Sequence, residues 1–220
     1  GLRDANWTVR TDILTGHESV NRNLAVYNGR LFGITADGVT AWDVHDGHEL
    51  FHVRMPANSV VRDLVVREGK LFVADDQKQI TTWSISDGAQ MSTTYRGADT
   101  SRLSVTLGWV FAGGVDGSVT AYNLTTGELT HTENSGIPQH CTSILQMGNT
   151  LYTAFGTDVV IWNVTDHALK RGESIRSKIN QNQSIQSLLG YKGQILAAAG
   201  QNVEGWPPPV MQPHNTAMRK

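Results

Sequence analysis

A short aromatic phrase recurs along this chain at intervals of about 40 residues. The phrase is Thr-Ala-Trp-Asp-Val at its first occurrence and Thr-Thr-Trp-Ser-Ile, Thr-Ala-Tyr-Asn-Leu and Val-Ile-Trp-Asn-Val at the next three. Its aromatic residues are Trp42, Trp83, Tyr122 and Trp162. A period of about 40 residues is typical of stacked supersecondary units, because one such unit cannot bury both of its faces alone.

A glycine between two short apolar runs follows the same period. The first of these glycines, Gly29, separates Leu24-Ala25-Val26 from Leu31-Phe32. The full set is Gly29, Gly69, Gly108, Gly148 and Gly193. Glycine tolerates the positive φ that a tight hairpin requires. Each glycine therefore predicts a turn between the first and second strands of a unit.

Two more turns follow within each unit. Asp37-Gly38 and Asp116-Gly117 precede the aromatic phrase, and Asp46-Gly47 follows it in the first unit. Asp-Gly between apolar runs is a strong hairpin signal. Three turns join four short antiparallel strands, and a four-stranded unit of about 40 residues is the blade of a β-propeller. The sequence therefore predicts an all-β propeller with about five blades.

One repeat carries a family resemblance. Residues 29–44 (Gly-Arg-Leu-Phe-Gly-Ile-Thr-Ala-Asp-Gly-Val-Thr-Ala-Trp-Asp-Val), preceded by Gly16-His17, resemble a WD-repeat. The resemblance extends loosely over residues 7–206 and implies a propeller that serves as a protein-interaction scaffold. It also implies a hydrogen-bonded network inside the first blade, made of His17, Thr35, Asp37 and Trp42.

A second family is similar in another repeat. Residues 116–129 (Asp-Gly-Ser-Val-Thr-Ala-Tyr-Asn-Leu-Thr-Thr-Gly-Glu-Leu) are similar to the repeat of quinoprotein-type propellers. The two resemblances agree on the fold and differ on function. The alternative to a scaffold is therefore a quinoprotein-like or glycan-active propeller enzyme.

The propeller is expected to occupy residues 1–206, followed by a Pro-rich tail at 207–220. The fifth unit ends at Trp206 before three prolines, which cannot pair within a central strand, so it lacks a fourth strand. A predicted strand at 7–14 would complete that blade and close the ring. A ring whose further blades come from a partner chain is the other possibility. The repeats are expected near 20–55, 60–96, 101–133, 140–172 and 184–206.

Composition narrows the classes of partner. The formal net charge of −2 gives no field that favours nucleic acid, although it leaves such a partner open. No apolar run approaches the roughly 18 residues of a spanning helix. The single Cys141 allows no internal disulfide and is expected to be a small buried hydrophobe. We therefore expect a location in the cytoplasm or nucleus.

No catalytic constellation is evident in the sequence. His45, His48 and His52 cluster around one hairpin, but metal sites need three or four convergent ligands, so we expect a solvated hairpin edge. Asp37 and Asp116 each have a structural role in an Asp-Gly turn. We therefore expect no catalytic residue, no metal and no cofactor.

Three arginines follow the same period and carry the candidate site. Arg22, Arg62 and Arg102 each come just before the first apolar run of a repeat. That position lies near the central opening of a propeller, where converging guanidinium groups would bind carboxylate or phosphate. We therefore expect a non-catalytic subunit of a larger complex that binds an acidic or phosphorylated peptide at the ring mouth. The polar segment 173–187 predicts an enlarged loop between the fourth and fifth repeats.

Overall fold

All regular structure in the described part of the chain is β-strand. The computed structural model describes residues 21–106, 108–165, 168–178 and 183–207. Its strands are β1 Asn21–Tyr27, β2 Arg30–Thr35, β3 Gly38–Asp43, β4 Glu49–Arg54, β5 Val61–Arg67, β6 Lys70–Asp75, β7 Gln79–Ser84, β8 Gln90–Arg96, β9 Thr100–Thr106, β10 Trp109–Gly114, β11 Ser118–Asn123, β12 Leu129–Asn134, β13 Cys141–Met147, β14 Thr150–Phe155, β15 Asp158–Thr165, β16 Ala168–Arg176, β17 Ser187–Tyr191, β18 Gln194–Ala199 and β19 Asn202–Trp206.

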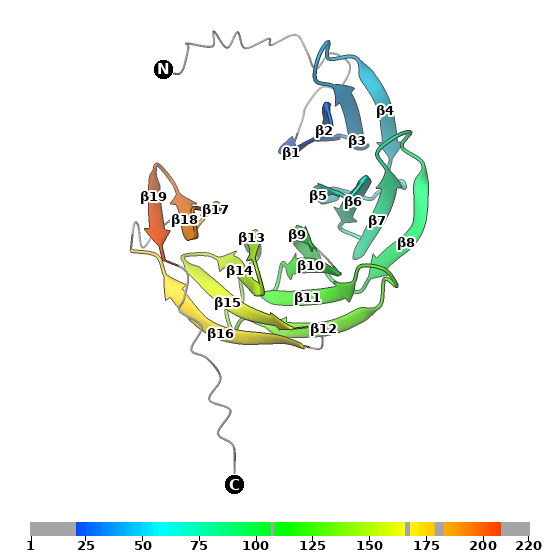
Figure 1. The fold of residues 1–220 in the computed structure, drawn as a ribbon. Coiled ribbons are helices and arrows are strands. Elements are labelled where there is room, and N and C mark those ends of the chain that lie inside the picture. The colour runs from blue at the N-terminus through cyan, green and yellow to red at the C-terminus, as the bar shows by residue number, and fades with distance from the viewer. Residues whose placement is uncertain (1–20, 107, 166–167, 179–182, 208–220) are drawn as a thin grey trace, which may run out of the picture.

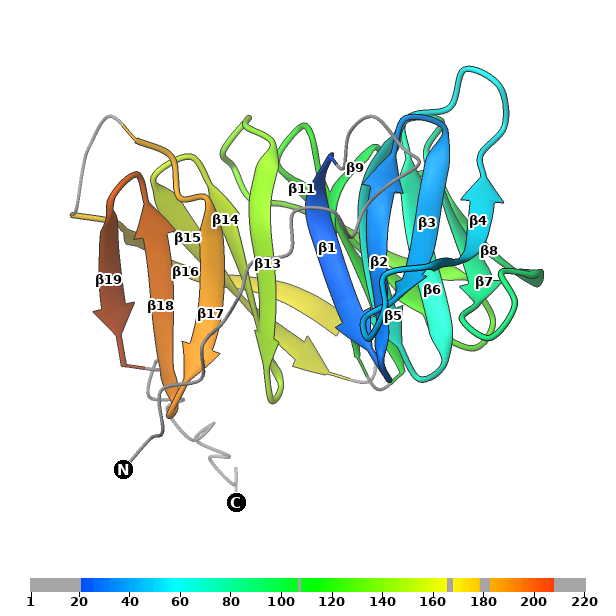
Figure 2. The same ribbon diagram turned by 90° about the horizontal axis from the view of Figure 1, so that it is seen from above.

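These strands form five antiparallel sheets in which chain neighbours pair in order. Four sheets have four strands each, and the fifth, β17–β18–β19, has three. The sheets are arranged like blades around a common axis, with β1, β5, β9, β13 and β17 innermost (Figure 1). The inner strands run roughly along that axis (Figure 2). The predicted β-propeller with five blades is confirmed. The last blade has three strands, as the proline run after Trp206 predicts.

The turn glycines have the backbone conformation that the sequence predicts. All five have positive φ, between 58° and 86°. In the first, second and fifth blades the preceding residue also has positive φ: Asn28, Glu68 and Lys192. Two successive residues with positive φ form a type I′ turn, whose twist matches that of the flanking strands. Local sequence therefore fixes the tight connection between the first two strands of these blades.

The hydrophobic core lies between the blades, in four separate clusters. The first cluster packs Phe32, Val39 and Ala41 of blade one against Leu71 and Val73 of blade two. The next three clusters repeat this arrangement between successive blades. Alternate residues of a strand point to opposite faces, so every internal blade contributes to two clusters.

The two end blades have only one described neighbour each. The blades follow an arc that takes up more than half of a circle, and β17–β19 and β1–β4 stand at its two ends (Figure 1). The predicted strand 7–14 lies outside the described residues, as does nearly all of the tail at 207–220. Closure of the ring by that strand therefore stays a prediction.

The loop between the fourth and fifth blades is shorter than predicted. Residues 173–176 belong to β16, where Ser174, Ile175 and Arg176 pair with β15. The polar composition of this segment reflects the exposure of an outer strand, which needs no apolar periodicity. In the described residues, no helix is long and apolar enough to cross a membrane.

Candidate functional site

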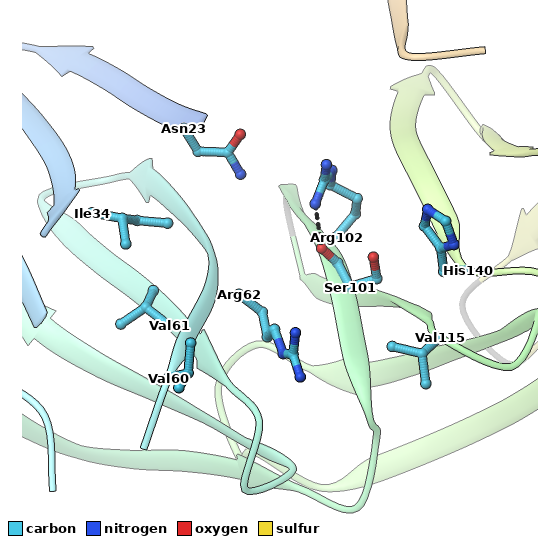
Figure 3. Close-up of a pocket in the computed structure, with 9 residues that line it drawn as sticks. All are labelled: Asn23, Ile34, Val60, Val61, Arg62, Ser101, Arg102, Val115 and His140. Carbon is cyan, nitrogen blue, oxygen red and sulfur yellow. Dashed lines mark hydrogen bonds between the residues drawn. The ribbon is translucent and has the colours of Figure 1, made fainter. Parts of the chain in front are cut away.

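A pocket opens at the hub between the first three blades. Its volume is about 600 Å³. The polar residues that line it are Asn23, Arg62, Ser101, Arg102 and His140 (Figure 3). They come from three inner strands and from the loop before a fourth, β13, so the repeat architecture gathers them at one end of the axis. Two of the three predicted arginines thus share one pocket.

β-Bulges at the start of the inner strands set the direction of these side chains. The pairing register of β5 with β6 shifts between Val61 and Asp63, so Arg62 lies in a bulge. The register of β9 shifts between Thr100 and Arg102. A bulge bends its strand and re-aims the side chain beside it. Arg22 lies in a corresponding irregular part of β1, and its side chain is outside the described structure.

Arg102 is held in place by backbone carbonyl groups. Its Nε donates to the carbonyl oxygen of Thr142 at 2.9 Å, in the inner strand of the next blade. Its Nη1 donates to the carbonyl oxygen of Ser101 at 2.7 Å. The side chain is half-buried. These bonds orient one guanidinium before any ligand arrives, which lowers the entropic cost of binding.

Arg62 is exposed and adjoins the acidic turn between β6 and β7. The carboxylate of Asp76 in that turn accepts the N–H of Val60 at 2.9 Å. That hydrogen bond, together with a smaller contribution from the charge of Arg62, lowers the pKa of Asp76. Arg62 is therefore the exposed cation of the pocket, beside the half-buried Arg102.

A buried carboxylate, Asp63, joins the first three blades beneath the arginines. Its Oδ2 accepts the N–H of Leu103 at 2.7 Å, and its Oδ1 accepts that of Leu64 at 2.9 Å. Asn23 of blade one donates its side-chain N–H to the same Oδ1. Burial raises the pKa of Asp63 to about 6, although these donors and the nearby charge of Arg102 act in the opposite direction. Desolvation of the ionised form outweighs its hydrogen bonds here.

The raised pKa of Asp63 predicts a pH-dependent stability. An unfolded Asp titrates near 3.9. Because the pKa of Asp63 is higher in the folded chain, the contribution of its protonated form to folding stability is fully present below about pH 3.9. That contribution is lost as pH rises through about 6. Relative to Asp63→Asn, the free energy of unfolding of the wild type should fall by up to about 3 kcal/mol between pH 4 and 7. Urea unfolding of both chains across this range measures the difference, and a constant difference would contradict the prediction.

Within blade one, a network forms around a different histidine from the one the WD-repeat resemblance implies. His52 Nε2 lies 3.1 Å from Asp37 Oδ1, and His52 Nδ1 lies 2.8 Å from Thr40 Oγ1. Arg54 Nε also lies 3.4 Å from Asp37 Oδ2. Burial opposes ionisation of Asp37, but the charge of His52 and backbone hydrogen bonding lower its pKa.

The other members of the implied network are not linked to Asp37 by any hydrogen bond among the described residues. Thr35 and Trp42 are both buried, and His17 lies outside the described structure. The four-residue network therefore stays a prediction. In blade four, by contrast, Trp162 Nε1 donates to Thr153 Oγ1 at 2.7 Å. The register position of Thr153 is occupied by Gly33 in blade one, so that bond has no counterpart there.

The remaining candidate groups have structural roles. Asp116 accepts the N–H and hydroxyl of Ser118 at 3.0 and 2.6 Å, as a turn-capping residue does. Cys141 is a free, buried thiol, and burial raises its pKa to about 12. His48 pairs with Asp46. Across the described ranges, no three His, Cys, Asp or Glu side chains converge as a metal site would require.

Comparison with known proteins identifies the family. The family model described as outer membrane protein assembly factor BamB matches residues 7–129 and 35–204, which together cover most of the chain. The chain belongs to this family. The match supports the quinoprotein-type resemblance seen at residues 116–129 and does not confirm the WD-repeat family. No curated protein matches the chain.

Solved structures agree with the fold. BamB from Moraxella catarrhalis superposes with a TM-score of 0.69 at 17% identity, over 87% of this chain and 58% of that one. The WD40 propeller domain of Doa1 gives 0.70 at 21% identity, over 87% and 64%. The computationally designed Ika8 protein gives 0.60 at 17% identity, over 88% and 73%. The chain therefore spans less than two thirds of the BamB and Doa1 structures.

Sequence reasoning missed the residues that join the blades at the hub. Asn23 and Asp63 stand one period apart, and Ser143 stands two periods after Asp63. Ser143 Oγ accepts the N–H of Leu188 at 2.9 Å, as Asp63 accepts that of Leu103. The sequence pattern that could have indicated them is a polar residue that recurs directly before the apolar run of an inner strand.

Proposed function

We propose that this chain is a non-catalytic interaction scaffold, a subunit of a larger complex that binds an acidic or phosphorylated peptide at the ring mouth. The observation that carries the proposal is the pocket shared by Arg62 and Arg102. Arginine binds carboxylate and phosphate groups through paired N–H donors. Membership of a family described as an assembly factor supports a role with protein partners.

We propose that the two arginines have different roles in binding. Arg102 lines the pocket and is oriented by two carbonyl groups. Arg62 is exposed at the pocket. His140 and Ser101 add polar atoms at the rim. We propose that the acidic side chain of the peptide lies between the two guanidinium groups.

Loss of the exposed arginine tests the proposal. Arg62→Ala should weaken binding of a fluorescein-labelled glutamate-rich or phosphoserine peptide by about tenfold or more, because a charge-assisted hydrogen bond contributes about 1.5–3 kcal/mol. Arg62→Ala with Arg102→Ala should abolish binding in a fluorescence anisotropy titration. Arg67→Ala is the matched control, since Arg67 lies at the other end of the same strand and pairs with Glu68.

Two results would contradict the proposal. Unchanged peptide affinity in the double variant would exclude the arginine pocket as the binding site. A visible absorption band from the purified chain would instead favour the quinoprotein-like enzyme, because a bound quinone absorbs visible light. The location in the cytoplasm or nucleus is a separate prediction, which cell fractionation tests.

A further inference from the structure

Two aliphatic side chains are exposed at the arginine pocket. Val60 is 55% exposed and Val115 is 39% exposed, and both line the pocket together with Arg62 and Arg102. In the view of Figure 3, Arg62 lies between the two valines. The pocket therefore combines two cationic groups with two exposed apolar surfaces, so its ligand should offer both kinds of group.

The exposure of these valines belongs to the mouth of the pocket and not to the ends of the arc. Val60 directly precedes β5 of blade two, and Val115 lies in the turn between β10 and β11 of blade three. Core clusters join blade two to blades one and three, and blade three to blades two and four. Both valines therefore belong to blades that already have a neighbour on each side.

The fold does not require a large aliphatic residue at either place. The same backbone hydrogen bond joins Asp76 to Val60 in blade two and Val115 to Asp99 in blade three, so the two pairs occupy equivalent positions. Other blades carry small or polar residues there: Ala36, Asp76 and Gly156 in place of Val115, and, in blades three and four, Asp99 and His140 in place of Val60. The turns form without valine, so the two valines are available for recognition.

Hydrogen bonds hold the backbone of both valines in place. Val60 donates its N–H to Asp76 Oδ1 at 2.9 Å, and its carbonyl oxygen accepts the N–H of Asp76 at 3.0 Å. Val115 donates its N–H to the carbonyl oxygen of Asp99 at 3.0 Å. Valine is also stiff at χ1. The two side chains therefore form a preorganised apolar surface, which binds at a low entropic cost.

The pocket is larger than one acidic group needs. Its volume is about 600 Å³. A water molecule takes up about 30 Å³ in the liquid, and a carboxylate or phosphate group is only a few times larger. The pocket therefore has room for a second side chain next to the group that the arginines bind.

We infer that the pocket recognises a peptide in which an aliphatic residue accompanies the acidic or phosphorylated residue and packs against Val60 and Val115. The inference rests on the proposed function, in which Arg62 and Arg102 bind the acidic group. In an extended peptide, side chains two positions apart point to the same side, so the aliphatic residue stands two positions from the acidic one. Apolar surface that leaves water on binding adds to the affinity.

Two phosphoserine peptides that differ only in these flanking residues test the inference. The fluorescein-labelled probes are Gly-Leu-Ala-pSer-Ala-Leu-Gly and its counterpart with alanine in place of both leucines. In a fluorescence anisotropy titration, the full chain should bind the leucine peptide about tenfold more tightly, because burying a few methyl and methylene groups changes the affinity by about this factor. The double variant Val60→Ser, Val115→Ser should reduce this preference to about twofold or less.

Val44→Ser is the matched control. Val44 is 43% exposed and, like the other two valines, lies outside the strands. Its N–H donates to the carbonyl oxygen of Gly29, in the hairpin at the far end of β1 from the pocket. This variant should keep the full preference for leucine. Arg62→Ala should weaken binding of both peptides by a similar factor, because it removes a contact to the phosphate group that both share.

Each other result overturns the inference, and the arginine variants show whether the proposed function falls with it. Equal affinity for the two peptides, with binding still lost in Arg62→Ala with Arg102→Ala, would retain the acidic-peptide site and exclude an aliphatic contact. A leucine preference that survives in the double serine variant would place that contact away from Val60 and Val115. Absence of binding by either peptide, or binding that the arginine double variant leaves unchanged, would contradict both the proposed function and this inference.

Discussion

Replacing Val159 by aspartate should unfold the contact between the fourth and fifth blades. Val159 is fully buried in the cluster that also contains Tyr152 and Leu188. A carboxylate there loses its hydration and gains no described partner, which costs several kcal/mol. We expect the free energy of unfolding to fall by more than about 3 kcal/mol. Urea unfolding followed by tryptophan fluorescence measures the loss.

The same substitution at Val203 should have almost no effect on the stability of the isolated chain. Val203 has the register position of Val159 in the next blade but is mostly exposed. Exposed substitutions usually change stability by less than about 0.5 kcal/mol. Because both variants replace valine by aspartate, a difference between their free energies of unfolding reports the burial of the site and not the change of side chain. Equal destabilisation by both would contradict the structural difference between the two faces.

The blade could be predicted from sequence because its determinants are local. A positive φ at Gly29 or Gly69 depends on the turn alone, and alternation along a strand depends on that strand alone. The number of blades that pack side by side could not be predicted in this way, because it depends on contacts between successive sheets. Nothing within a 40-residue unit shows whether Val203 has a neighbouring blade.

The sequence could place two of the three arginines near the hub but could not predict their contacts. The 40-residue spacing of Arg62 and Arg102 was enough to place both near the hub, where they line one pocket. It did not show that their register positions differ, since Arg102 pairs with Gly113 whereas Asp63, not Arg62, pairs with the equivalent Ala74. The bonds from Arg102 to backbone carbonyls, and the buried Asp63 beneath it, depend on bulges and on neighbouring blades. The hydrogen-bond partner of the recurring aromatic residue also varies between blades, because the position of Thr153 in blade four is occupied by Gly33 in blade one.

Replacing Trp162 by alanine should be the most damaging truncation in the fourth blade. The side chain is fully buried in the cluster between blades three and four. Removing so large a buried aromatic costs about 3–5 kcal/mol through lost contacts and the remaining cavity. Urea unfolding monitored by far-ultraviolet circular dichroism measures this loss, because the signal does not depend on the removed indole. Trp206→Ala is the control, since Trp206 is only partly buried on the last strand and should cost less.

The hydrogen bond of Trp162 can be separated from its packing. Trp162→Phe keeps most of the ring volume but removes the N–H that Thr153 Oγ1 accepts. Because Thr153 is fully buried, its hydroxyl then loses a partner, at a cost of about 1–3 kcal/mol. Adding Thr153→Val removes that hydroxyl too, so the double variant should be more stable than the sum of the single variants predicts. Strict additivity would show that the indole contributes to the blade interface through packing alone.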